Sequence, residues 1–181
     1  MLFRSGPSSQ GTVFRLSPPS AGKTAWTETV LHAFTGKADG GYPQNDLISD
    51  SAGNLYGEAG VVFKLTRPVA GKTNWTETVL HSFTGKADGD APQTGLVFDA
   101  AGNLYGTTSG GGASKHGTVF KLTRPTSGNG AWTATILHSF SLNAQGGEPL
   151  AGLIFDEFGN LYGTTVEGGA FGQGTVFKLA P

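Results

Sequence analysis

GTVFKLTRPTSGNGAWTATILHSF, Gly117 to Phe140, decides the fold, because nearly the same string stands at Gly11 to Phe34 and at Gly60 to Phe83. Its first six letters return at Gly174 to Leu179. Counted from each opening glycine, a Trp follows after 15 residues, a His after 21, a Pro after 32 and an Asp after 39. The string GNLYG begins 42 residues after that glycine. The chain is therefore a tandem repeat, and one unit of this size cannot bury its hydrophobic face alone.

The first unit is shorter than the next two, with lengths of 49, 57 and 57 residues. The difference lies in one place. Only Glu58 and Ala59 separate GNLYG from the next opening glycine, where Thr107 to His116 stand one unit later. We expect a tight hairpin at Glu58 and projecting loops at the corresponding places in the later units.

Composition limits the classes of fold and function. With 30 Gly in 181 residues and only 14% charged residues, the chain is rich in turns and poor in solvated helix. A net charge of −1 without long runs of either sign predicts no nucleic-acid or membrane surface. The absence of Cys excludes disulfides and thiolate metal sites. No apolar run is long enough for a membrane span, and Met1 to Gln10 lacks the apolar segment of a signal peptide. Any export signal is expected outside this chain.

Four short strands are predicted in each full unit. We name them A (as in LIFD), B (NLYGTT), C (TVFKL) and D (WTATILHSF), since each is rich in β-branched and aromatic residues and is bounded by turn residues. Four antiparallel strands per unit, in several copies, are typical of a β-propeller blade. A parallel β-helix is the alternative, although its coils repeat at shorter periods. The single repeat domain, 1–181, would comprise a C–D half blade (11–34), full blades (45–83 and 94–140) and a partial blade (151–179), giving 13 strands.

The turn between strands A and B has the same chemistry in every unit. Its Asp can accept backbone N–H groups a few residues on, and its Gly can take a positive φ. The residues concerned are Asp50, Asp99 and Asp156 with Gly53, Gly102 and Gly159. Such Asp residues could also act as general acids or Ca²⁺ ligands. A capping residue is needed at every turn, whereas a catalytic residue is needed once, so we interpret them as structural.

Together, GTVFKL, W-T-x-T-x-L-H-x-F, P-x-x-x-L and D-x-x-GNLYGTT-x-x-GG resemble the bacterial tandem repeats called GloVer repeats, which occur in extracellular or surface (choice-of-anchor) proteins. The resemblance covers essentially residues 11 to 179. It implies a propeller-like fold and export, and it transfers no catalytic residue. Two departures are the missing A and B strands before Gly11 and the GEAG at Gly57 in place of a longer loop. We expect the chain to be part of a longer array.

Two other residue types recur once per unit. A His on strand D (His32, His81, His138) could suggest a metal site, but equivalent positions on neighbouring blades lie too far apart for one zinc ion. We expect these His to hydrogen-bond a neighbouring loop or blade. We interpret the Trp residues as blade-packing aromatics rather than as carbohydrate-stacking platforms.

Residues that differ between units are better candidates for function. In a propeller, the D–A and B–C connections emerge on one face, which we call the loop face. In this chain the D–A and B–C connections are long, glycine-rich and polar, as in loops that carry function on a rigid scaffold. The charged residues of the loop face are the candidate binding residues Lys37, Asp39, Lys86, Asp88, Lys115, His116, Glu148 and Glu167.

An enzyme would need polar residues at the axis end of strand A from several blades. The three pairs there are Asn45-Asp46, Thr94-Gly95 and Ala151-Gly152, so only one blade offers a carboxylate. Paired carboxylates for glycoside hydrolysis would have to come from Asp39 and Asp88. We therefore predict a non-enzymatic binding or display module of an exported bacterial protein, without cofactor or metal, whose ligand would be a glycan or a surface protein. A glycan- or lactone-directed hydrolase with a site on the loop face is the alternative.

Closure of the ring is not expected. The first unit supplies strands C and D and the last supplies A, B and C, so completing one blade from both ends leaves a strand in excess. The sequence predicts an open arc of three to four blades, with apolar faces uncovered at its ends, among them those bearing Phe14, Val30 and Phe177. Such faces favour either further repeats of a longer array or self-association.

Overall fold

The computed structural model describes residues 8–92, 94–127 and 130–181, and within these ranges it has no helix and 13 strands in four antiparallel sheets. None of those residues forms a helix long and apolar enough to cross a membrane. The first sheet holds β1 (Thr12–Ser17) and β2 (Thr27–Ala33). The second holds β3 (Ile48–Ser49), β4 (Leu55–Glu58), β5 (Val61–Thr66) and β6 (Thr76–Ser82). The third holds β7 (Val97–Phe98), β8 (Leu104–Thr108), β9 (Thr118–Thr123) and β10 (Thr133–Ser139). The fourth holds β11 (Ile154–Phe155), β12 (Leu161–Thr165) and β13 (Thr175–Leu179).

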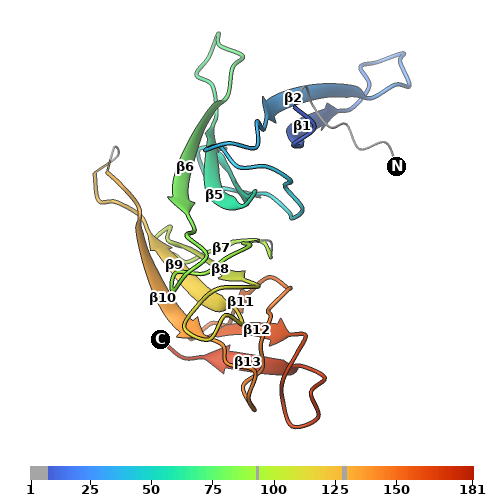
Figure 1. The fold of residues 1–181 in the computed structure, drawn as a ribbon. Coiled ribbons are helices and arrows are strands. Elements are labelled where there is room, and N and C mark those ends of the chain that lie inside the picture. The colour runs from blue at the N-terminus through green and yellow to red at the C-terminus, as the bar shows by residue number, and fades with distance from the viewer. Residues whose placement is uncertain (1–7, 93, 128–129) are drawn as a thin grey trace.

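Each sheet is a simple meander in which consecutive strands pair, as in a propeller blade. The four sheets follow one another along an open arc, with the first and fourth at its two ends (Figure 1). This confirms the prediction of an all-β, propeller-like open array. The A strands are shorter than expected, because Asp50 and its equivalents already belong to the turn that follows. The D strands begin one residue after the Trp.

The hydrophobic core lies between the sheets rather than within any one of them. Three clusters of buried side chains each join one blade to the next. A Val near the start of strand C points toward the following blade and is buried there. These residues, Val13, Val62 and Val119, are 4%, 0% and 0% exposed. The Phe that follows strand D stacks edge-on against a Phe of the next strand C, as in Phe34 on Phe63 at 5.2 Å between ring centroids. Each blade therefore has a forward face, which covers its successor, and a backward face, which its predecessor covers.

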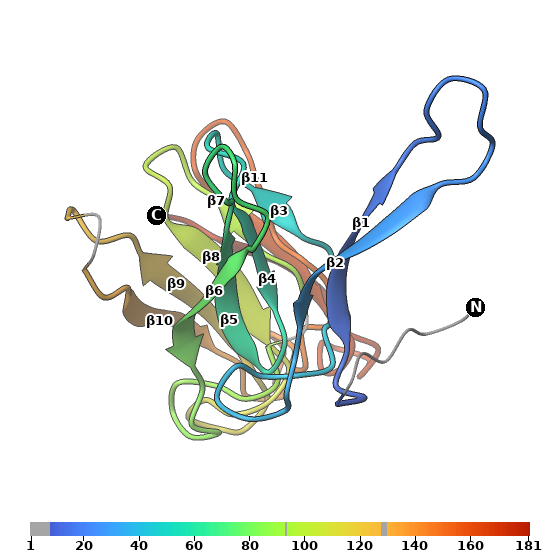
Figure 2. The same ribbon diagram turned by 90° about the horizontal axis from the view of Figure 1, so that it is seen from above.

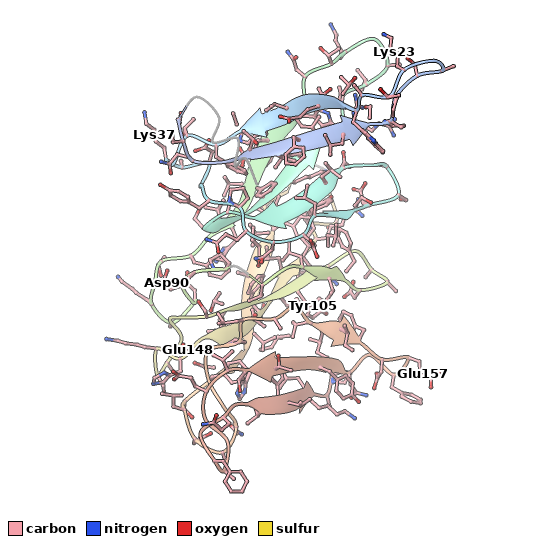
Figure 3. The ribbon with its side chains drawn as sticks, turned by 90° about the vertical axis from the view of Figure 1, so that its right-hand side faces the viewer. Lys23, Lys37, Asp90, Tyr105, Glu148 and Glu157 are labelled. Carbon is pink, nitrogen blue, oxygen red and sulfur yellow. The ribbon has the colours of Figure 1, made fainter. Side chains whose placement is uncertain are left out.

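The connections separate onto two sides of the stack of sheets. Figure 3 shows Lys37, Asp90 and Glu148, from the D–A connections, along one side. Lys23, from a C–D hairpin, and Glu157, from an A–B turn, lie along the other side. Seen from above, the D–A and B–C loops gather together, while the β1–β2 hairpin projects away from the other sheets (Figure 2).

The two outer faces of the arc are uncovered, with one difference from expectation. Phe14 and Val30, on the backward face of the first sheet, are 51% and 50% exposed. Phe177 is half-buried instead, because it points backward and stacks on Phe140. The exposed hydrophobic residues on the forward face of the last sheet include Val176 and Ile154. Alternation along strand β13 explains the correction, since neighbouring residues face opposite sides of a sheet.

Candidate functional site

The Asp of each A–B turn is held by hydrogen bonds from its own turn and from the Tyr of the strand that follows. Asp99 Oδ1 accepts the backbone N–H groups of Ala101 and Asn103 at 2.9 Å each, and its Oδ2 accepts Asn103 Nδ2 at 2.7 Å and the Tyr105 hydroxyl at 3.1 Å. Burial works to raise the pKa of Asp99, but these hydrogen bonds outweigh it and hold the pKa below its usual value. Gly102 takes φ +79°, which the turn requires. Asp50 and Asp156, with Gly53 and Gly159, repeat the arrangement.

Asp39 and Asp88, two candidate residues of the D–A connections, are hydrogen-bonded inside their own loops. Asp88 accepts the Thr84 backbone N–H at 2.9 Å and the Thr84 hydroxyl, and its Oδ2 lies 3.8 Å from His81 Nε2. Burial lowers the pKa of His81 by more than the Asp88 charge raises it, which favours the neutral imidazole. Asp39, Thr35 and His32 repeat this arrangement one unit earlier. Each Asp thus stiffens its loop. Lys37 and Lys86 are exposed in the same loops.

The other four candidate residues are brought together by backbone pairing of three loops. The Glu148 N–H donates to the His116 carbonyl at 2.8 Å, and the Val166 N–H donates to the Glu148 carbonyl at 3.3 Å. The Glu167 N–H donates to the Gly147 carbonyl at 3.2 Å. Lys115 adjoins His116 and has a positive φ of 66°. The D–A connection therefore lies between two B–C loops and is bonded to both.

One position in each D–A connection has a strained backbone. Tyr42, Ala91 and Glu148 immediately precede the repeated Pro and have φ of 55°, 53° and 53°. A residue before Pro normally prefers extended geometry, and a non-glycine residue pays an energetic penalty at positive φ. The strain recurs at one offset, so it belongs to the fold, whereas the side chain differs at each occurrence. The loop face thus presents a variable side chain from a fixed backbone.

The sequence predicts a tight hairpin at Glu58, and the structure has this residue at the end of β4, paired with Val62 and followed by the two-residue turn Ala59-Gly60. Its side chain had no assigned role. It is 3% exposed, and its Oε2 accepts the backbone N–H groups of Thr94 and Gly95 in the next blade at 2.9 and 2.8 Å. Oε1 is buried and has no hydrogen-bond partner among the described residues.

The carboxyl of Glu58 differs from every other carboxyl of the described chain in its burial. Desolvation raises its pKa to about 7, against the two backbone hydrogen bonds and that from Asn45, which lower it. The clue in the sequence was the Glu itself, because Thr107 and Thr164 occupy the equivalent position. Thr107 bonds within its own blade, to the hydroxyl of Thr94 at 2.7 Å, whereas Glu58 reaches into the next blade.

The family model described as Gloeobacter/Verrucomicrobia repeat matches residues 1–181. The chain belongs to this repeat family. The resemblance to GloVer repeats is thereby confirmed. No curated protein matches the chain.

This Gloeobacter/Verrucomicrobia repeat chain also has grooves between its blades. One groove of about 500 Å³ lies beside Trp75 and the cationic side chains Arg15, Arg67 and Lys72. Another of about 630 Å³ lies beside Trp132 and Lys64. Both Trp rings are partly buried against the core clusters between blades. Among the described residues of the repeat, no group of three His, Cys, Asp or Glu is placed to hold a metal ion.

Proposed function

We propose that this repeat chain is a non-enzymatic binding and display module of an exported bacterial protein, and that it binds its partner on the loop face. The observation that carries the proposal is the position shared by Tyr42, Ala91 and Glu148. Its backbone is the same in three units, down to the positive φ, while its side chain is different each time. A scaffold that holds a variable residue in one fixed geometry is suited to recognition.

The rigidity of this face supports the proposal. Backbone hydrogen bonds connect the D–A connection to the adjacent loops at more than one blade, as in the Asp90 N–H to Gly110 carbonyl bond of 2.9 Å. Preorganised loops lose less conformational entropy on binding than free loops do. The recurring Asp and His are used by the scaffold, which leaves the residues that differ between units as the recognition elements.

The partner class we infer is a glycan or another surface protein, and the placement outside the cell rests on the family resemblance to repeats of surface proteins. The exposed residues of the loop face include a Tyr ring, Lys37 and Lys86, which suit contacts with sugar rings and hydroxyls. The face carries charges of both signs, so binding should depend only weakly on salt.

The test is a binding screen of the purified chain on immobilised glycans and bacterial surface proteins, with divalent metals as a separate arm. Tyr42→Ala with Glu148→Ala should reduce binding at least about tenfold, because contact residues near the centre of an interface carry most of its energy. Trp75→Ala, in the groove on the opposite side, is the comparison. If Trp75→Ala alone lost binding, the binding site would lie in the groove beside Trp75, and the assignment to the loop face would be wrong.

A hydrolase is the second candidate, and one observation favours it. A buried carboxyl with a pKa near neutrality is what a general acid requires, and Glu58 is such a group. Its Oε2 is, however, occupied by two backbone N–H groups of the neighbouring blade. We therefore assign Glu58 to blade packing. Glycoside or lactone hydrolysis by the purified chain that disappears in Glu58→Gln would reverse this assignment.

A further inference from the structure

The two uncovered ends of the arc are the two halves of one repeated interface. At every internal junction the forward face of one blade covers the backward face of the next. At the ends, these same faces have no cover. We propose that they bind each other between molecules, so that the chain associates head to tail with a second copy of itself.

On the forward face of the fourth sheet, residues that are buried at the internal junctions are exposed. Val176 stands at the position of Val62 and Val119, and it is 79% exposed where they are 0%. Thr164 stands at the position of Glu58 and Thr107, which are 3% and 0% exposed, and it is exposed. Ile154, 67% exposed, extends the same surface from strand A. The residue types of an internal junction are therefore present but uncovered.

On the backward face of the first sheet, apolar residues that are buried in the internal blades are exposed. Phe14 is 51% exposed, whereas Phe63 and Phe120 at the same position are 0% exposed. Leu16 is 52% exposed, whereas its equivalents Leu65 and Leu122 are 0% exposed. Val30, 50% exposed, completes the patch from β2. The sheet of β1 and β2 lies at the opposite end of the arc from β13, so one molecule cannot bring the two faces together while it keeps the open shape (Figure 1).

The internal junctions identify the occupant. In all three of them, a Val from strand C of one blade belongs to the same cluster as buried residues of the next blade; Val62, for example, clusters with Phe120 and Leu122. A second copy supplies this arrangement through Val176 on Phe14 and Leu16. Among the described residues, each end lacks part of a full blade, since β13 pairs only with β12 and β1 pairs only with β2. The contact between copies is therefore smaller than an internal junction, and the association is expected to be reversible.

The two faces are different, and so the association has a direction. A head-to-tail contact between unlike faces continues from molecule to molecule or closes into a ring of several copies. A contact between like faces stops at a dimer. This difference gives the experiment its discriminating power.

Sedimentation velocity over a concentration series tests the proposal with end-specific variants. Wild type should form species larger than the monomer as concentration rises. Val176→Glu and Phe14→Glu should each remain monomeric, with the dissociation constant raised at least about tenfold, because a buried apolar contact is replaced by a charge. Phe158→Glu and Phe171→Glu are matched controls, since these Phe are 77% and 90% exposed but lie in loops outside the strands.

Mixing the two end variants completes the test. Val176→Glu retains an intact first sheet, and Phe14→Glu retains an intact last sheet. A one-to-one mixture should form a dimer and nothing larger, because each molecule offers one usable face. A monomeric wild type at all concentrations would overturn the proposal. So would dimers that persist in either variant alone, or association lost equally in the Phe158 and Phe171 controls.

Discussion

Replacing Glu58 by Gln tests how neighbouring blades are joined. The Gln side chain has nearly the same shape, and its carbonyl oxygen can accept the two backbone N–H groups that Glu58 Oε2 accepts. The change therefore removes the ionisation and keeps the contact. The effect of the substitution on the free energy of unfolding should depend on pH, because only the wild-type side chain titrates.

The direction in which the free energy of unfolding changes with pH follows from the direction of the pKa shift of Glu58. Burial raises the pKa of Glu58 from 4.5 to about 7 in the folded protein. Between these values the folded state holds a proton that the unfolded state has released, so the free energy of unfolding falls as the pH rises. A shift of this size corresponds to about 3 kcal/mol, at roughly 1.4 kcal/mol per unit of pKa. The contribution of Glu58 is greatest below pH 4.5, declines from pH 4.5 to 7 and stays low above that.

The assay is urea unfolding followed by tryptophan fluorescence at several values between pH 4 and 8. The difference between Glu58→Gln and wild type should change by about 3 kcal/mol over this range, in favour of the variant at high pH. Taking the difference removes every contribution that is the same in both proteins. Glu157→Gln, which removes an exposed carboxyl, is the control and should follow wild type. Parallel curves for Glu58→Gln and wild type would refute the reasoning.

Three further predictions concern the scaffold, and urea unfolding measures each of them. Phe120→Ala should cost about 3 to 5 kcal/mol, whereas Phe14→Ala, at the same position of the half-exposed first sheet, should cost less than about 1 kcal/mol; equal costs would contradict the account of the core between blades. Gly102→Val should cost about 1 to 3 kcal/mol, because it forces a β-branched residue to φ +79°, and an unchanged stability would remove the turn assignment. Asp99→Ala should cost about 1 kcal/mol or more at neutral pH and progressively less as the pH falls through the lowered pKa of Asp99, where protonation weakens the wild-type turn as well; loss of a binding activity at unchanged stability would show a functional Asp instead.

The sequence predicted the architecture because each strand and turn pattern recurs in several units of the repeat. The strands, their order and the A–B turn followed from strings such as DAAGNLYG, in which the Asp, the Gly and the β-branched run each have a local physical reason. The short hairpin at Glu58 followed from counting residues between GNLYG and the next unit. These features depend on interactions within a few residues of the chain.

The rest depended on contacts between units, which spacing does not reveal. The role of Glu58 arises from two N–H groups that lie 36 and 37 residues later in the next blade. The positive φ of Tyr42, Ala91 and Glu148 had no signal, since no Gly or Asn stands there and the strain is imposed by bonds to other loops. Phe177 was expected to be uncovered, but its side chain points toward the preceding sheet and packs on Phe140. Which residues of the last strand face that sheet depends on contacts between sheets, and the spacing of the repeats does not show them.

The most direct test of the open array is a distance between its two ends. The chain contains no Cys, so Lys23→Cys with Glu157→Cys gives two unique labelling sites, both exposed and at opposite ends of the stack of sheets (Figure 3). Electron-spin distance measurements, on labelled chains diluted with unlabelled chains, should show no population near the separation of two packed sheets, about 10 Å. A single narrow population at such a short separation would mean that the fourth blade packs on the first within one molecule, and it would contradict the open arc.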